Sequence, residues 1–142
     1  KIDHDLYPDL LKQLGIDQPF KNKKLFIRYG GPVESGRGFI LHSDDLIRKE
    51  TLTIDKGVAL TNTAEFFDDL AKNSGPKYSI LALGYTGWGP GQLEYEIKQN
   101  SWMNIPIESS FLFDEKVTTK WDDAYKLMGI NPSNLSLFSG NA

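Results

Sequence analysis

The chain has 142 residues, and its 16 Lys and Arg against 19 Asp and Glu give a formal charge of -3. Domains usually hold about 100 to 200 residues, so we predict a single domain over residues 1–142. The absence of cysteine excludes disulfides, cysteine-ligated metals and thiol catalysis. The longest apolar run, Ile80 to Leu83, is far shorter than the roughly 20 residues that a membrane-spanning helix needs.

Hydrophobic patterns predict the first elements of the chain. Leucines at helical spacing predict a helix over Asp5–Leu14. Strands are expected over Lys24–Tyr29 and Arg37–Ser43, and the glycine-rich loop between them favours their pairing as a hairpin. A second, tighter hairpin is predicted from Thr51–Ile54 and Val58–Leu60.

A helix and a buried strand follow. Thr63 is suited to cap a helix that ends at the segment from Asn73 to Pro76. Tyr78–Leu83 is apolar on both faces, which is typical of a central strand, so we place it in the middle of the sheet.

The C-terminal part adds two helices and a strand. Helices are predicted over Gln92–Asn100, with Pro90 in its first turn, and from Thr119 to Met128, while Phe111–Phe113 reads as a strand. Together the patterns predict an α+β fold with a mixed sheet of about six strands flanked by about four helices.

The first of two glycine-rich segments spans Gly30 to Gly38. It contains the frame of a phosphate-binding loop, but Arg37 and Gly38 stand where that motif needs a lysine and a hydroxyl. A hairpin loop that needs positive φ angles at Gly31 and Gly36 explains the composition better.

The second segment, Gly84–Gly91, links a strand to a helix, as dinucleotide-binding turns do. Its glycine spacing differs from that motif, and Pro90 removes one backbone amide that would serve a pyrophosphate. Two interpretations stay open: an anion bound at the helix start, or close backbone packing with Tyr85 and Trp88 covering the core.

Candidate catalytic groups are few. His42, Ser43 and Asp44 are consecutive on a strand, where adjacent side chains point to opposite faces, so they cannot form a triad among themselves. Two histidines exclude a three-histidine zinc site. We therefore assign no catalytic residue, no metal site and no cofactor, and we expect His42 to be structural.

Two blocks of sequence resemble one known family. They are Gly30–Val33 with Arg37–His42, and Leu83–Glu94 with Asn100 and Trp102 beyond. Together they closely resemble the bacterial YqgE/AlgH family over the chain from Leu6 onward. The resemblance implies an α+β fold with a bulged, complex sheet and a cytoplasmic location. Members of the family are largely uncharacterised, and one branch is named as a regulator of alginate synthesis, which implies a role in transcription.

The resemblance also implies that the chain is truncated at its N-terminus, because family members carry a further strand-rich segment there. Loss of those strands would leave an unpaired sheet edge. We therefore expect self-association into a homo-oligomer through an exposed sheet edge.

The family's motif positions in this sequence define the candidate binding site: Gly30, Gly31, Pro32, Arg37, Gly38, Phe39, His42, Gly84, Tyr85, Gly87, Trp88, Gly91, Gln92 and Glu94. We hypothesise that the two glycine loops approach each other and form one shallow pocket. Arg37, His42 and Gln92 would supply its polar groups, and Trp88 would form a wall.

The favoured function is a non-catalytic binding or regulatory module for a protein partner or a small anionic ligand. The alternatives are a hydrolase-type enzyme that uses His42 and Glu94, or an anion- or nucleotide-binding protein that uses the glycine loops. Strong binding of nucleic acid is disfavoured, because the isoelectric point is near 5.3 and Lys and Arg are scattered.

Overall fold

The computed structural model describes Lys12 and residues 26–114, 116 and 118–131. The helix expected over Asp5–Leu14 lies outside the described residues apart from Lys12. Contacts divide the chain into a unit that ends at Trp88, called the sheet unit, and a unit that begins at Gly89, called the helical unit. The single-domain organisation stays a prediction.

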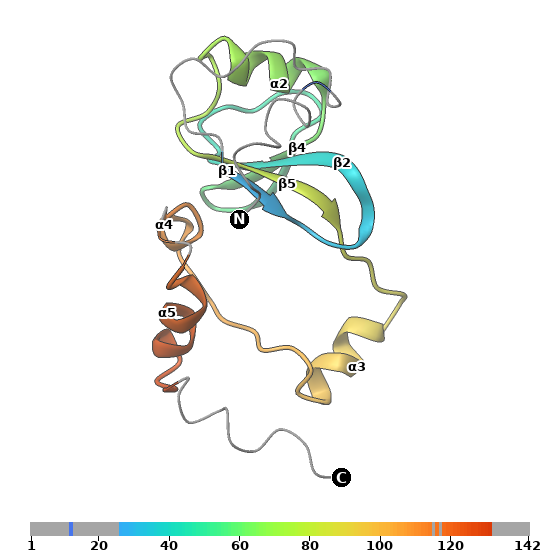
Figure 1. Ribbon diagram of the computed structural model, residues 1–142, viewed down its shortest axis with the longest axis vertical. Helices are drawn as coiled ribbons and strands as arrows, with labels where there is room; N and C mark the ends of the chain where they lie inside the picture. Colours follow the sequence, from blue (N-terminus) through green and yellow to red (C-terminus); the bar gives the residue numbers. More distant parts are fainter. Residues whose placement is uncertain (1–11, 13–25, 115, 117, 132–142) are drawn as a thin grey trace. The chain divides into compact units, whose positions relative to one another are not determined.

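The sheet unit contains a five-stranded mixed sheet in the order β1-β5-β2-β4-β3 (Figure 1). Its strands are β1 (Phe26–Tyr29), β2 (Val33–His42), β3 (Leu52–Asp55), β4 (Val58–Thr61) and β5 (Ser79–Tyr85). β1 runs parallel to β5, and the other neighbouring strands pair antiparallel. The α+β class is confirmed, with five described strands where about six were expected.

The predicted hairpin between the first two strands is wrong, because β5 lies between β1 and β2. The chain leaves β1 at Tyr29 and crosses the end of β5 to reach β2. Gly30 donates its amide to the Leu83 carbonyl at 2.8 Å. A Cβ on Gly31 would lie 2.3 Å from the carbonyl carbon and oxygen of Tyr85. Glycine is therefore needed here for close backbone approach, and neither Gly31 nor Gly36 has the positive φ that we predicted.

β5 is an interior strand, as its apolar character predicted, although β2 occupies the middle of the sheet. The predicted second hairpin is confirmed by the antiparallel pairing of β3 with β4. Gly57, in the turn between β3 and β4, has φ +80°. Tight turns require this left-handed conformation, which glycine adopts without strain.

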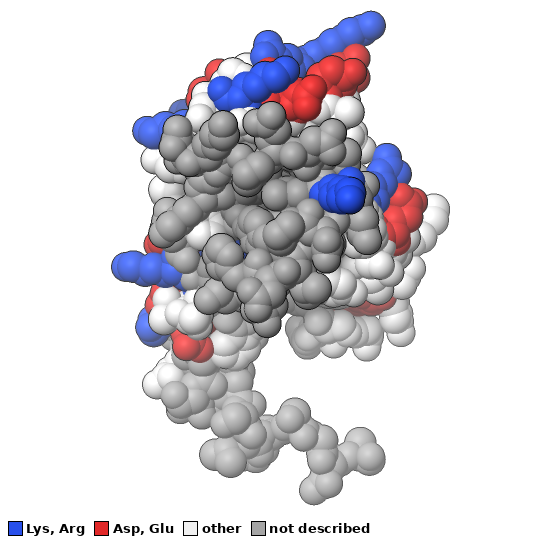
Figure 2. Space-filling view, turned by 45° about the horizontal axis from the view of Figure 1, so that its top comes forward, with Lys and Arg blue, Asp and Glu red and all other residues white. Residues whose placement is uncertain are grey.

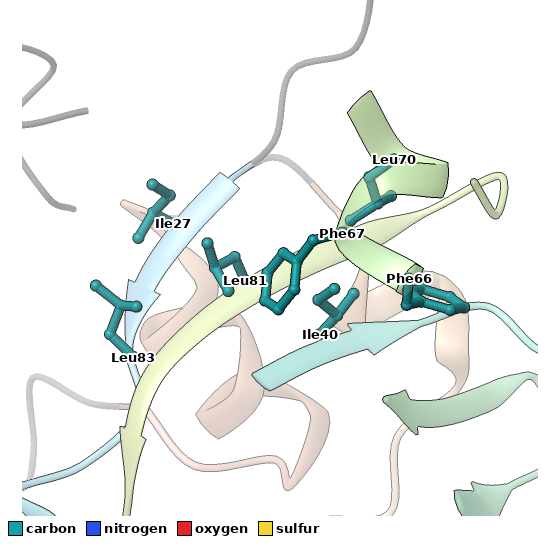
Figure 3. Close-up of a cluster of buried hydrophobic side chains, with 7 residues drawn as sticks. All are labelled: Ile27, Ile40, Phe66, Phe67, Leu70, Leu81 and Leu83. Carbon is teal, nitrogen blue, oxygen red and sulfur yellow. The ribbon is translucent and has the colours of Figure 1, made fainter. Parts of the chain in front are cut away.

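One helix covers a face of the sheet. α2 (Ala64–Ala71) begins after Thr63, as predicted, and buries Phe66, Phe67 and Leu70. Ile27, Ile40 and Leu81 stand opposite one another on β1, β2 and β5 and face this helix. Figure 3 shows Phe67 of α2 beside Leu81 and Ile40, and Phe66, Leu70 and Leu83 belong to the same buried cluster. Burial of each such side chain stabilises the fold by about 1.5–3 kcal/mol.

The helical unit contains α3 (Gln92–Lys98), α4 (Ser109–Leu112) and α5 (Lys120–Leu127). The strand predicted at Phe111–Phe113 is wrong, because this segment belongs to α4 and the turn after it. A short apolar run fits a strand and a helix equally well by periodicity. Lys120 Nζ donates to the carbonyl oxygens of Leu112 and Asp114 at 2.6 and 3.0 Å, which caps the end of α4.

Pro90 precedes α3 instead of lying in its first turn. The Gln92 amide donates to the Gly89 carbonyl at 3.0 Å, and Gly91 has φ +75° and ψ -4°. These values match a type II turn, which favours proline at its second position and requires a positive φ at its third. The glycines around Pro90 thus shape a turn that starts the helix.

Replacing Gly31 by alanine tests the crossing of β5. The new Cβ would collide with the Tyr85 backbone, so we expect a loss of roughly 1–3 kcal/mol in unfolding free energy. Gly36→Ala is the matched control, because no atom lies within 4 Å of its added Cβ. Urea denaturation followed by circular dichroism measures both, and equal losses in the two variants would contradict the crossing.

Candidate binding site

A bulge in β2 shapes the candidate site. Val33 pairs with Tyr85 and Gly38 pairs with Leu83, so four residues of β2 stand opposite Gly84 alone. These four residues, Glu34 to Arg37, are exposed. Bulges often redirect side chains next to functional sites, and this one confirms the bulged sheet that the family resemblance implied.

Gly84 changes the face of the sheet on which the last residue of β5 lies. Its φ is +72°, and an added Cβ would lie 2.4 Å from the Gly31 carbonyl oxygen. Side chains normally alternate between faces along a strand, so Tyr85 would share the core face with Leu83. The Tyr85 ring instead meets Phe39 edge-on at 5.7 Å, and Phe39 pairs with Ala82 on the face away from α2. Gly84 therefore moves Tyr85 to the opposite face.

Four side chains form a closed ring of contacts at this corner, which we call the corner cluster: Glu34, Arg37, Phe39 and Tyr85. Arg37 Nη1 lies 2.9 Å from Glu34 Oε2, and the Tyr85 hydroxyl donates to Glu34 Oε1 at 3.3 Å. The Arg37 guanidinium lies 5.2 Å from the centre of the Phe39 ring, a cation–π contact. The Phe39–Tyr85 contact closes the ring.

The charges of the corner cluster face solvent. The Arg37 and Glu34 side chains are 53% and 46% exposed. The hydrogen bond from Arg37 lowers the pKa of the Glu34 carboxyl below its ordinary value. Exposed ion pairs add little to stability because water competes for both partners. The pair of Glu34 and Arg37 therefore contributes little to the stability of the fold.

The structure brings the first glycine segment and the start of the second together, as predicted. Gly30, Gly31, Arg37, Gly38, Gly84 and Tyr85 all lie at this corner, with Pro32 in the connecting loop. Gly87 is exposed and Trp88 is half-buried at the end of the sheet unit.

Gly91, Gln92 and Glu94, three further predicted residues, belong to the helical unit. Gln92 Oε1 accepts the Gly89 amide at 3.0 Å, while its Nε2 donates to Glu96 at 2.8 Å. Gln92 thus braces the turn before α3, and Gly91 and Glu94 are exposed. A pocket shared by Gln92, Trp88 and Arg37 stays a prediction.

His42 lies inside the core, with 0% of its surface exposed. Its Nδ1 is 2.8 Å from the Ser43 carbonyl oxygen, which can only accept, so Nδ1 carries the proton. Nε2 therefore accepts from the Thr61 hydroxyl at 2.9 Å. The Thr61 oxygen then accepts from Thr51 at 2.8 Å, and the Thr51 oxygen accepts the Arg48 amide at 3.0 Å. Each donor in this series of hydrogen bonds has an acceptor.

This environment makes His42 structural and neutral. Its ring packs 4.5 Å from the ring of Phe66 on α2. Burial lowers the pKa of the imidazole below 6.5, although the Ser43 carbonyl and the nearby Asp44 and Asp45 act in the opposite direction. The Ser43 hydroxyl donates to Asp45, and His42 bonds only the backbone carbonyl of Ser43, so these neighbours form no triad.

Sequence reasoning missed Glu34, Thr51 and Thr61. Glu34 and Arg37 carry opposite charges three residues apart around a glycine, a pattern that could have marked the ion pair. No sequence signal marked the threonines, because the contact of Thr61 with His42 spans 19 residues and the contact of Thr51 with Thr61 spans 10, and both depend on how the chain folds.

On the one face that Figure 2 shows, the charges of the described residues are mixed. On the face shown in Figure 2, basic and acidic side chains lie beside one another instead of forming one broad area of a single sign. Across the described parts of the chain, no group of three or more His, Asp or Glu is arranged to hold a metal ion. Among those same residues, no helix is long and apolar enough to cross a membrane.

The fold and site define an α+β protein whose mixed sheet is bulged over a glycine-rich corner. The chain belongs to the DUF179 family, described as AlgH-like, whose model matches residues 4–133. This membership confirms the resemblance seen in the sequence blocks.

Relatives and a solved structure agree with this assignment. The chain is 46% identical to a UPF0301 protein of Beijerinckia indica and 44% identical to one of Bradyrhizobium diazoefficiens, over 144 residues in each case. These matches cover 96% of this chain and 70% and 67% of the two relatives. The solution structure of the AlgH protein from Pseudomonas aeruginosa is similar, with a TM-score of 0.73 and 34% identity over 94% of this chain and 71% of that one.

The lowered pKa of His42 predicts a pH dependence of stability. His42 binds a proton less readily in the folded chain than in the unfolded chain. Its contribution to the free energy of unfolding is therefore complete above about pH 6.5 and is lost as the pH falls toward the pKa of the folded state. We expect the melting temperature to fall between pH 7.5 and 5.5, and His42→Gln to flatten that fall. An NMR titration of the imidazole gives the pKa directly, and a value at or above 6.5 would refute the prediction.

Loss of the donor to His42 should destabilise the fold. Thr61→Val leaves Nε2 as a buried acceptor without its hydroxyl, which costs about 1–3 kcal/mol. Thr53→Val on the exposed strand β3 is the matched control and should change the unfolding free energy by less than about 0.5 kcal/mol. Chemical denaturation compares the two, and a Thr61 variant as stable as the control would contradict the chain of hydrogen bonds.

Proposed function

We propose that this chain is a non-catalytic binding module that recognises the carboxylate of a small acidic ligand at the corner cluster. The observation that carries the proposal is the position of Glu34. Its carboxylate is held on one oxygen by Arg37 and on the other by the Tyr85 hydroxyl. An external carboxylate has the same shape and charge, so it fits the same two donors.

The neighbouring groups suit this role. Arginine pairs with carboxylates through a planar fork of donors, and Arg37 is oriented over the Phe39 ring. The Gly31–Tyr85 crossing fixes the backbone beneath the cluster. The donors are therefore held in place before a ligand arrives, which reduces the ordering cost of binding.

Regulation and a cytoplasmic location, both implied by the family, form part of the proposal. We place the regulatory step in binding of a ligand or protein partner, because the mixed charges in Figure 2 suit phosphate backbones poorly. The hydrolase alternative gains no support, because its base His42 is fully buried with both ring nitrogens bonded.

Arg37→Ala tests the proposal. The probes are succinate, glutamate and a short peptide rich in Asp and Glu, titrated while amide shifts are followed by NMR. We expect shifts centred on residues 30–38 and 84–86 that are lost in Arg37→Ala. Arg48→Ala is the matched control and should keep them, since Arg48 is 48% exposed and paired with Asp69 elsewhere in the sheet unit.

Glu34→Gln provides a second test, in which the affinity for the probe should rise instead of fall. It removes the carboxylate that competes for Arg37, so affinity for the probe should rise about two- to five-fold. Shifts that appear elsewhere, or that survive Arg37→Ala, would refute the proposed site. Shifts seen with the peptide but not with the small acids would overturn the small-ligand form of the proposal and indicate a protein partner.

A further inference from the structure

We propose that two copies of this chain form a weak symmetric dimer by antiparallel pairing of their β3 strands, centred on Thr53. This surface is separate from the corner cluster, so the inference goes beyond the proposed carboxylate binding. Its occupant is a second copy of the same chain.

β3 is the more accessible of the two edges of the described sheet. The other edge, β1, contributes Ile27 to the core, whereas all four residues of β3 are exposed. Leu52 and Ile54 are 58% and 54% exposed. Among the described strands, β3 pairs with β4 alone, so its other side presents backbone groups of the kind that pair with a further strand.

The sequence around Thr53 is self-complementary in charge. In an antiparallel pair related by a two-fold axis, residues equally far from the centre on either side become partners. Leu52 of one copy then faces Ile54 of the other, and Glu50, which precedes β3, is brought toward Lys56, which follows it. Both charged residues lie in the turns that flank β3 and are exposed, and opposite charges brought near each other attract. Each ion pair and each apolar pair occurs twice.

The short length of β3 determines the strength of the dimer. Four residues a side bury less than the roughly 1,000 Å² that stable interfaces exceed. The dimer should therefore depend on concentration and dissociate on dilution. Lysines and a bulge are features that limit edge pairing; the register irregularity between Thr53 and Asp55 shortens the regular stretch further.

Charge exchange tests the register. Sedimentation equilibrium of the 142-residue chain, from about 10 µM to about 1 mM, gives the dimer dissociation constant. Glu50→Lys sets two lysines opposite each other and Lys56→Glu sets two glutamates, so each single variant should weaken the dimer at least about three-fold. The double variant Glu50→Lys/Lys56→Glu recreates both opposite-charge pairs and should restore the original dissociation constant.

Lys49→Glu is the matched control. It makes the same change of charge one residue away from Glu50, but its counterpart across the axis is the uncharged Gly57, so the dissociation constant should stay within about two-fold. Circular dichroism checks that every variant is folded. A monomer over the whole concentration range would overturn the proposal. So would a dimer that the single reversals leave unchanged, or one that the double variant does not restore.

Discussion

The passage of the chain over the end of β5 is the constraint on which the sheet unit depends. Gly30 and Gly31 lie so close to the β5 backbone that a Cβ at either position would stand 2.3 Å from a backbone atom. This approach lets β1 and β2 flank β5 on its two sides instead of pairing with each other. It also places the start of the β2 bulge directly over Gly84. The core, the order of the strands and the corner cluster therefore all depend on the close approach of Gly30 and Gly31 to β5, which a side chain at either position would prevent.

Much of the fold could be predicted because the deciding patterns are local. The amphipathic α2, with its start after Thr63, and the β3–β4 hairpin are defined by residues a few positions apart. The strand order was not predictable in the same way. Whether β1 pairs with β2 or with β5 depends on contacts between segments more than 50 residues apart, and the glycine-rich loop suggested the nearer partner. The prediction of a strand at Phe111 was wrong for another reason, since three apolar residues do not distinguish a strand from a helix.

The site shows the same limits. The family blocks directed attention to both glycine segments, yet the contacts at the corner centre on Glu34, which no motif singled out. His42 was expected to be structural from its place on a strand, and its buried, fully bonded ring agrees. The prediction that His42 supplies a polar group to a surface pocket is wrong, because its side chain is buried. Sequence identified which backbone segments meet, whereas strand register decided which side chains reach solvent.

The β2 bulge separates the proposed recognition surface from the packed core. Among the described strands none pairs with residues 34–37, and the space beside Gly36 is open, so changes of size or charge there meet solvent and not the core. The residues that hold the bulge in place, Gly31 and Gly84, tolerate almost no change. Under the proposed function, relatives with this architecture would acquire different ligand preferences by substituting a short exposed stretch, while the sheet beneath stays as it is. Divergence in specificity would appear as variation confined to these four positions within an otherwise stable framework.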